Sequence, residues 1–166
     1  MIWFGIAYTK IKFSNFIIFP SIRKFIWLYQ IRIRVSKELS EALRTTSQSA
    51  EVIEINAIAQ KHGTRLVCTF DGFSDYCAEA EQNGTEDYPL YDWTKQTISN
   101  PEKVQKHLRS FAFYKGDKQV YSLALADALF FDLEILLKSG KIEELNKIDS
   151  NPKNNPQPPT TEVSVL

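Results

Sequence analysis

Apolar residues recur at helical spacing through most of the chain between residues 36 and 139. Ser47 or Ser49 is placed to cap one of these helices, and Gly63 to end it. The run Asn100-Pro101-Glu102 is a strong start signal, because Asn caps, Pro suits the first helical position and an acid faces the helix dipole. The pattern predicts helices over 36–45, 49–62, 73–82, 91–98, from 101 onward, over 124–139 and over 141–148.

Short runs of β-forming residues interrupt these helices. Residues 66–70 (Leu-Val-Cys-Thr-Phe) form an apolar run typical of a strand that is buried on both faces, and Asp71-Gly72 follows as a stop. Residues 111–114 and 119–123 flank the Gly-containing segment 115–118, which predicts a β-hairpin. We therefore expect an α+β fold: a helix-rich single domain with a short β-sheet that includes a hairpin near 111–123.

The first 34 residues differ from the rest of the chain. After Pro20, a helical stripe of apolar residues appears, with basic residues mostly elsewhere: Ile22, Phe25, Ile26, Tyr29 and Ile33. A basic amphipathic helix of this kind can lie on a membrane surface or pack on its own domain. A further alternative is that residues 1–34 are a spurious extension, with the native start near Val35. We expect a globular domain over 35–148 and a disordered Pro/Asn-rich tail over 149–166.

Composition excludes several classes of protein. The chain has 166 residues, of which 43% are hydrophobic and 24% charged, too apolar for a wholly disordered chain. It lacks an apolar run of 18 residues, so we expect no membrane span, and two cysteines are too few for a disulfide scaffold. These features favour a cytoplasmic domain.

The zero net charge conceals an asymmetry. Residues 1–34 contain six basic residues and no acid, so the remaining residues have a net charge of −6. That charge opposes contact with phosphates, and we therefore expect no nucleic-acid partner.

An acidic stretch interleaved with aromatic residues offers a surface for a protein partner. No basic residue occurs from Leu66 to Thr94. The predicted partner-binding residues are Asp71, Asp75, Tyr76, Glu79, Glu81, Asp87, Tyr88 and Trp93.

Signals for a metal site are weak. Asp71, Asp75 and His107 are the candidates for a hard cation, but Asp-Gly-Phe-Ser-Asp lacks the alternating ligand spacing of a calcium loop. The spacing of the cysteine and histidine residues matches no zinc motif: His62, Cys68, Cys77 and His107. We expect no cofactor.

Three functional hypotheses remain. The first is a small cytosolic regulatory or adaptor domain that acts through protein–protein contacts. The second is a small enzyme with a carboxylate-lined, metal-assisted pocket. The third is a peripheral membrane protein held by residues 1–34. No signature of a known enzyme class occurs in the sequence, so whether the protein is an enzyme stays open, with the balance against it.

Overall fold

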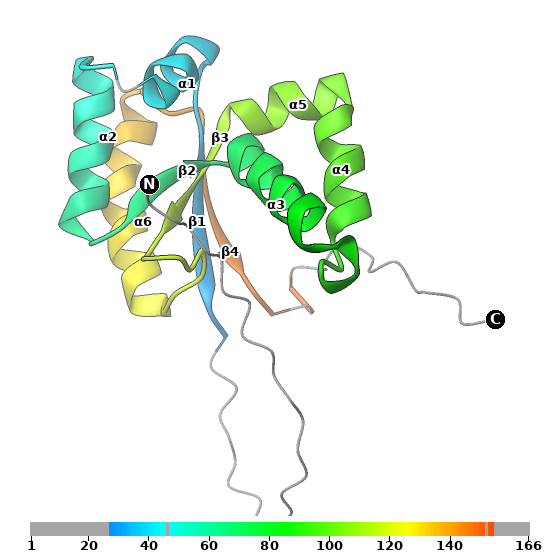
Figure 1. Cartoon of the computed structure of the whole chain (residues 1–166). Helices are drawn as coiled ribbons and strands as arrows, with labels where there is room; N and C mark the ends of the chain where they lie inside the picture. The colour runs from blue at the N-terminus through cyan, green and yellow to red at the C-terminus, as the bar shows by residue number, and fades with distance from the viewer. Residues whose placement is uncertain (1–26, 46, 152, 155–166) are drawn as a thin grey trace, which may run out of the picture.

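The computed structural model describes residues 27–45, 47–151 and 153–154. In these residues, helices pack on both faces of a four-stranded antiparallel sheet (Figure 1). The elements in chain order are β1 (Tyr29–Arg34), α1 (Lys37–Arg44), α2 (Ala50–Lys61), β2 (Arg65–Cys68), α3 (Thr69–Asn83), the 3-10 turn η1 (Thr85–Asp87), α4 (Tyr91–Ser99), α5 (Pro101–Leu108), β3 (Ser110–Tyr114), α6 (Leu123–Lys138) and β4 (Glu144–Asp149). The predicted helix-rich α+β domain is confirmed.

The strands follow a split β-α-β arrangement. Their order across the sheet is β2-β3-β1-β4, and every neighbouring pair is antiparallel. The strands β1 and β2 therefore run parallel to each other with β3 between them, and α6 connects β3 to β4. This is the connectivity of ferredoxin-like folds. One feature departs from the simple form: the neighbouring strands β2 and β3 are joined by the helices α3, α4 and α5 rather than by a hairpin turn.

The main hydrophobic core lies between one face of the sheet and the helices α2 and α6. Ile31, Ile33 and Phe113 point from the sheet into it, and each is at most 1% exposed. Ile55 of α2 and Leu133 of α6 are equally buried on the helical side. Helices α1, α2 and α6 therefore form one layer, on the left of the strands in Figure 1.

The opposite face of the sheet is more polar, and the inserted helices cover it. Gln30, Arg32 and Arg34 alternate along β1 with the core residues, so their side chains lie on this second face. Helix α3 contacts β2 and β3, and α5 contacts β3. Figure 1 shows α3, α4 and α5 as a separate group on the right of the strands.

The structure corrects the expectation for the N-terminal segment. Residues 29–34 are not the end of an amphipathic helix outside the folded body. They form the strand β1, which pairs with β3 on one side and with β4 on the other. Pairing on both sides and burial of Ile31 and Ile33 outweigh the helical spacing of the apolar residues. Residues 27 and 28 precede β1 without regular structure, and residues 1–26, with the start of the predicted helix, lie outside the described residues.

Two further elements differ from their predictions. Residues 119–123 form no strand; instead, the turn 115–118 closes on itself and Tyr121 makes a single bridge to Tyr29. Because β3 already pairs with β2 on one side and with β1 on the other, the turn is bridged only at Lys115–Lys118 and no second strand returns along β3. Residues 144–149 form the edge strand β4 rather than a helix, because β1 offers a free edge for pairing. The tail was predicted over 149–166. Asp149 instead ends β4, residues 150, 151, 153 and 154 follow it without a helix or strand, and residues 152 and 155–166 lie outside the described residues.

The other predicted helix boundaries are close to those observed, except that α3 begins at Thr69, inside the strand predicted over 66–70, and β2 ends at Cys68. The hydroxyl of Ser49 accepts a hydrogen bond from the Val52 amide at 3.4 Å, and Asn100 caps α5, with Pro101 at its start. Gly63 follows α2 with φ at 62°, a conformation that other residues rarely adopt. None of the described helices has both the length and the apolar character needed to cross a bilayer.

One polar cluster joins the two helices of the main core. The carboxylate of Asp132 on α6 accepts hydrogen bonds from Lys61 Nζ and from the His62 ring, both at 2.7 Å. Asp132 is 19% exposed, and these two donors, first Lys61 and then His62, hold its pKa below the usual range. A carboxyl with a lowered pKa stabilises the fold above its unfolded-state pKa of about 4, and this stabilisation is lost as the pH falls through the folded-state pKa.

We expect Asp132→Asn to lower the free energy of unfolding at pH 7 by about 0.5–1 kcal/mol, since the contacts are partly screened by solvent. Urea denaturation of both proteins at pH 7 and at pH 3 measures this. The difference between them should shrink at pH 3, and a difference independent of pH would contradict the assignment.

Candidate functional site

A pocket lies between the second face of the sheet and the inserted helices. Its volume is about 310 Å³, and it opens to solvent. The floor is a row of three residues, one from each of three strands: Val67 on β2, Ala112 on β3 and Arg32 on β1. Ala112 is the register partner of both Val67 and Arg32, so the three side chains lie side by side on one face. Because Ala112 is small, the centre of the floor is open.

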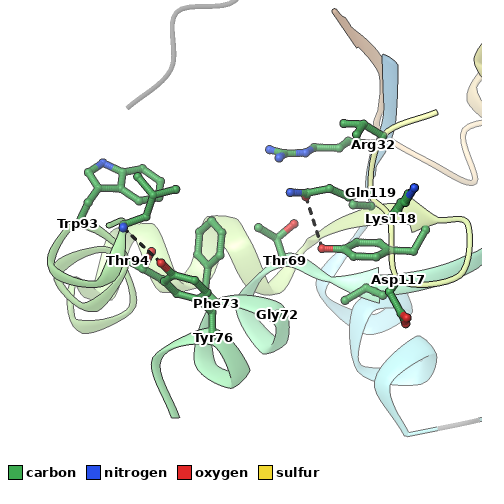
Figure 2. Close-up of a pocket in the computed structure, with 15 residues that line it drawn as sticks. Arg32, Thr69, Gly72, Phe73, Tyr76, Trp93, Thr94, Asp117, Lys118 and Gln119 are labelled. Carbon is green, nitrogen blue, oxygen red and sulfur yellow. Dashed lines mark hydrogen bonds between the residues drawn. The ribbon is translucent and has the colours of Figure 1, made fainter. Parts of the chain in front are cut away.

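Aromatic side chains from the inserted helices form one wall. Phe73 and Tyr76 come from α3 and Trp93 from α4. The rings of Phe73 and Trp93 meet edge to face with centroids 5.7 Å apart, and the Tyr76 hydroxyl accepts a hydrogen bond from the Leu90 amide at 3.2 Å. The wall is therefore held by contacts between α3 and the α4 region (Figure 2). The turn after β3 contributes the remaining rim, with Asp117, Lys118, Gln119 and Val120.

A chain of polar side chains runs along the sheet beside this floor. Arg32 Nε donates to Gln30 Oε1 at 2.6 Å, and Gln30 Nε2 donates to Gln119 Oε1 at 2.8 Å. The Tyr114 hydroxyl lies 3.4 Å from the same Gln119 oxygen. Gln30 is only 4% exposed, so its own side chain is held in place, and its bond to Nε restrains the Arg32 side chain. Burial lowers the pKa of Arg32, and the nearby Tyr114 partly offsets this.

The pocket also contains a polar atom with no partner. Thr69 is 8% exposed, and its Oγ1 makes no hydrogen bond with any of the described residues. Thr69 is the first residue of α3, and Cys68 before it provides no side-chain cap. In Figure 2 the Thr69 hydroxyl points to the side on which Arg32 and Gln119 lie. A buried hydroxyl without a partner is unfavourable, which makes this position a candidate contact for a ligand.

The residues predicted to bind a partner have different roles in the structure: some line the pocket, some contact other residues of the domain, and some are exposed. Two of its aromatic residues, Tyr76 and Trp93, line the pocket, and Tyr88 packs edge to face on Tyr76 at 5.4 Å. Several acids are engaged within the molecule: Asp71 makes a two-pronged ion pair with Arg44, Glu79 accepts from the Tyr88 hydroxyl, and Glu81 accepts from Lys95 and the Tyr91 hydroxyl. Asp75 and Asp87 are exposed. The acidic residues mainly tie α3 to its neighbours.

The candidate metal ligands do not form a cluster. Asp71 is turned to Arg44, while His107 packs its ring on Phe73 with centroids 5.2 Å apart. Burial, with Lys106, Arg32 and Lys103 nearby, lowers the pKa of His107, whereas partial desolvation of its carboxyl, followed by the charge of Asp71, raises the pKa of Asp75. In the described part of the chain, no three His, Cys, Asp or Glu residues lie close enough to hold a metal ion.

The cysteine and histidine residues considered for zinc have separate surroundings. The thiol of Cys68 lies 3.6 Å from the carbonyl oxygens of His107 and Leu108, and His62 bonds to Asp132. Cys77 is buried, and both cysteines are free thiols whose pKa is raised by burial. Nothing in this arrangement supports the zinc hypothesis.

Sequence reasoning missed the residues that form the floor and the polar side of the pocket. These are Gln30, Arg32, Val67, Thr69, Ala112 and Gln119. One signal was present: residues 29–34 (Tyr-Gln-Ile-Arg-Ile-Arg) alternate between polar and apolar, a pattern typical of a half-buried strand. That alternation places Gln30 and Arg32 together on the face opposite Ile31 and Ile33.

Comparison of the chain with protein-family models, with curated proteins and with solved structures gives no match.

Gly72 has room for a methyl group, so its replacement by alanine is expected to stabilise the fold. Gly72 lies inside α3 and lines the pocket; a Cβ there would meet Val67 Cγ1 at 3.6 Å and Tyr114 Oη at 4.0 Å, which is ordinary contact. We expect Gly72→Ala to raise the free energy of unfolding by about 0.5–1 kcal/mol, because glycine weakens a helix interior. Thermal melting monitored by circular dichroism measures the change.

The matched control for this substitution is Gly84→Ala. Gly84 has φ at 97°, and a Cβ there would lie 2.6 Å from Glu86 Oε2, so this change should lower the melting temperature. If Gly72→Ala also lowered it, the assigned space beside Gly72 would be wrong.

Proposed function

We propose that this protein is a small regulatory domain that binds a small organic molecule in the pocket between the sheet and α3–α4. The observation that carries the proposal is the composition of the pocket: aromatic side chains on one wall, a small residue at the centre of the floor and a few fixed polar groups at one side. Sites for small molecules combine a mainly apolar lining with a few such polar groups, and a volume of about 310 Å³ is near the lower limit for them.

The position of the pocket supports a regulatory role. A ligand there would contact the sheet through Ala112 and the inserted helices through Phe73 and Trp93 at the same time. Binding would therefore stabilise the position of α3–α5 on the sheet. The proposal locates the domain in the cytoplasm, where two buried free cysteines persist as thiols.

The other hypotheses from the sequence stay predictions. The adaptor role relied on a free acidic surface, and several of its acids have partners within the molecule. The enzyme hypothesis relied on Asp71, Asp75 and His107, which form no metal-binding group. Membrane contact through residues 1–34 rests mostly on residues outside those described.

The proposal is tested by recording amide and indole NMR spectra of the full chain with a fragment library that contains neutral, cationic and anionic compounds. Binding fragments should shift the signals of the Trp93 indole and the Ala112 amide. The variant Ala112→Leu fills the floor and should remove these shifts, while the exposed-site variant Ala128→Leu on α6 should keep them. The proposal fails if no fragment shifts these signals, or if Ala112→Leu leaves the shifts unchanged.

A further inference from the structure

Arg32 differs from the other described arginines in what its guanidinium contacts. Arg34 pairs with Glu144 at 2.6 Å and Arg44 with Asp71 at 2.7 Å, and Arg109 holds Glu143. Arg65 lies over the ring of Tyr114 at 5.3 Å. Arg32 has neither a carboxylate nor a ring among the described residues, only the neutral amide oxygen of Gln30 on its Nε. Its two terminal nitrogens are left to face the pocket, of which Arg32 is a lining residue.

The positive charge of Arg32 favours an anionic ligand, because no described side chain pairs with it. Taking a charged group out of water is costly unless an opposite charge compensates for it. The Gln30–Gln119 hydrogen bonds hold Arg32 in place without supplying that charge. A guanidinium whose Nε is already bonded still has four N–H groups on its two terminal nitrogens, and one from each nitrogen points the same way, which suits the two oxygens of a carboxylate.

Two further features on the same side of the pocket favour an anion. Thr69 Oγ1 is buried without a partner and is available as a hydroxyl donor. Thr69 also begins α3, a helix of 15 residues, so the positive end of the helix dipole lies at this wall. A half-buried cation, an unsatisfied hydroxyl and a helix N-terminus therefore occur together at one site.

The charges around the pocket set the charge of the ligand. Arg32, Lys118 and Asp117 are the charged lining residues, which gives the lining a net charge of +1. A monocarboxylate matches this charge, whereas a phosphate monoester carries about −1.5 to −2 at neutral pH and would leave an excess of negative charge.

The opposite wall sets the shape of the rest of the ligand. The edge-to-face pair of Phe73 and Trp93, with Tyr76 beside it, offers flat apolar surface that packs well on another ring. Ala112 leaves room between this wall and Arg32. We infer that the pocket binds a small monocarboxylate with a planar, aromatic body, whose carboxylate contacts Arg32 and Thr69 and whose ring packs against Phe73 and Trp93. This inference rests on the proposed function and names its ligand class.

The inference is tested by calorimetric or NMR titration of the full chain with matched probes. The probes are benzoate and indole-3-acetate, their primary amides, and phenyl phosphate. Each acid should bind at least roughly tenfold more tightly than its amide, because hydrogen bonds to a charged group are the stronger ones. If acids and amides bind with equal affinity, the inference fails while the proposed function stands. If phenyl phosphate binds more tightly than benzoate, the ligand class is wrong. If no probe and no library fragment binds, both proposals fail.

Variants locate the effect at Arg32. Arg32→Gln should abolish the preference for acid over amide. Arg32→Lys keeps the positive charge but cannot donate two parallel hydrogen bonds to a carboxylate, so it should reduce the preference. Arg34→Gln is the matched control, since Arg34 is on the same strand and face but pairs with Glu144 outside the pocket. Thr69→Val should weaken binding of the acids several-fold more than binding of the amides. A preference that survives Arg32→Gln would overturn the inference. The comparison of acid with amide on the unaltered protein remains decisive if a variant does not fold.

Discussion

A chain that begins at Ser36 is expected to be unfolded. Such a chain lacks β1, which lies between β3 and β4 and holds both of them in the sheet. It also lacks Ile31, Ile33 and Val35, each at most 1% exposed. Burial of a side chain of this size contributes about 1.5–3 kcal/mol. Together with the lost pairing on both sides, the loss exceeds the lower end of the usual stability of a domain, which is about 5 kcal/mol.

Circular dichroism and one-dimensional proton NMR measure this outcome. The full chain should melt cooperatively and show dispersed methyl signals, whereas the shortened chain should show neither. A cooperative transition in the shortened chain, at a temperature close to that of the full chain, would mean that β1 is dispensable and that the sheet is assigned wrongly.

We expect Tyr121→Phe to lower the free energy of unfolding by about 1–3 kcal/mol at neutral pH. The pairing of β3 with β1 stops at Ala112 and Arg32, so β3 does not pair with the first half of β1. Tyr121 takes its place: its backbone exchanges hydrogen bonds of 2.8 and 2.9 Å with Tyr29, and its hydroxyl accepts from the Ile31 amide at 3.0 Å. Without the hydroxyl, that buried amide has no partner and its full desolvation penalty appears.

The same residue should make the protein sensitive to alkali. Burial raises the pKa of Tyr121 to about 12, with the Ile31 hydrogen bond acting in the opposite direction. An acid whose folded-state pKa is raised stabilises the fold below its unfolded-state pKa, and this stabilisation is lost as the pH rises from about 10 towards the folded value. A difference of about two pKa units corresponds to a loss of about 2–3 kcal/mol over this range.

Urea denaturation between pH 7 and pH 11.5 of the wild type and of Tyr121→Phe measures both effects. The variant should be less stable at pH 7 and should lose less stability as the pH rises. Tyr29→Phe is the control, because the Tyr29 hydroxyl makes no hydrogen bond with the described residues, and it should change stability by less than about 0.5 kcal/mol. Equal effects of the two substitutions would contradict the role given to the Tyr121 hydroxyl.

The helices were predictable from the sequence because their signals are local. Apolar spacing, the caps at Ser49 and Asn100 and the stop at Gly63 act within a few residues of one another. The strands at the two ends of the domain were not predictable in the same way. Tyr29 and Ile33 fit a helical stripe as well as a strand, and β4 has only Leu145 and Ile148 as apolar residues, so pairing with distant segments decided both.

The candidate site was predicted only in part. The aromatic residues Tyr76 and Trp93 were singled out because they belong to the acidic stretch, and the structure brings both to the pocket. Arg32 was missed because it was assigned to a segment outside the folded body, and Thr69 because it was assigned to a strand. The properties that make these residues notable are the lack of an anionic partner for Arg32 and of any hydrogen-bond partner for the Thr69 hydroxyl, and both depend on tertiary packing, which has no local signal.

The helical connection between β2 and β3 has a consequence for how this domain can vary. Cys68 at the end of β2 and Phe111 near the start of β3 are direct register partners, so a short turn would suffice to join the two strands. The main core lies on the far face of the sheet. Residues 69–109 are therefore an accessory module on a scaffold that has its own source of stability. Selection can remodel that module, and with it the aromatic wall of the pocket, while the scaffold stays the same.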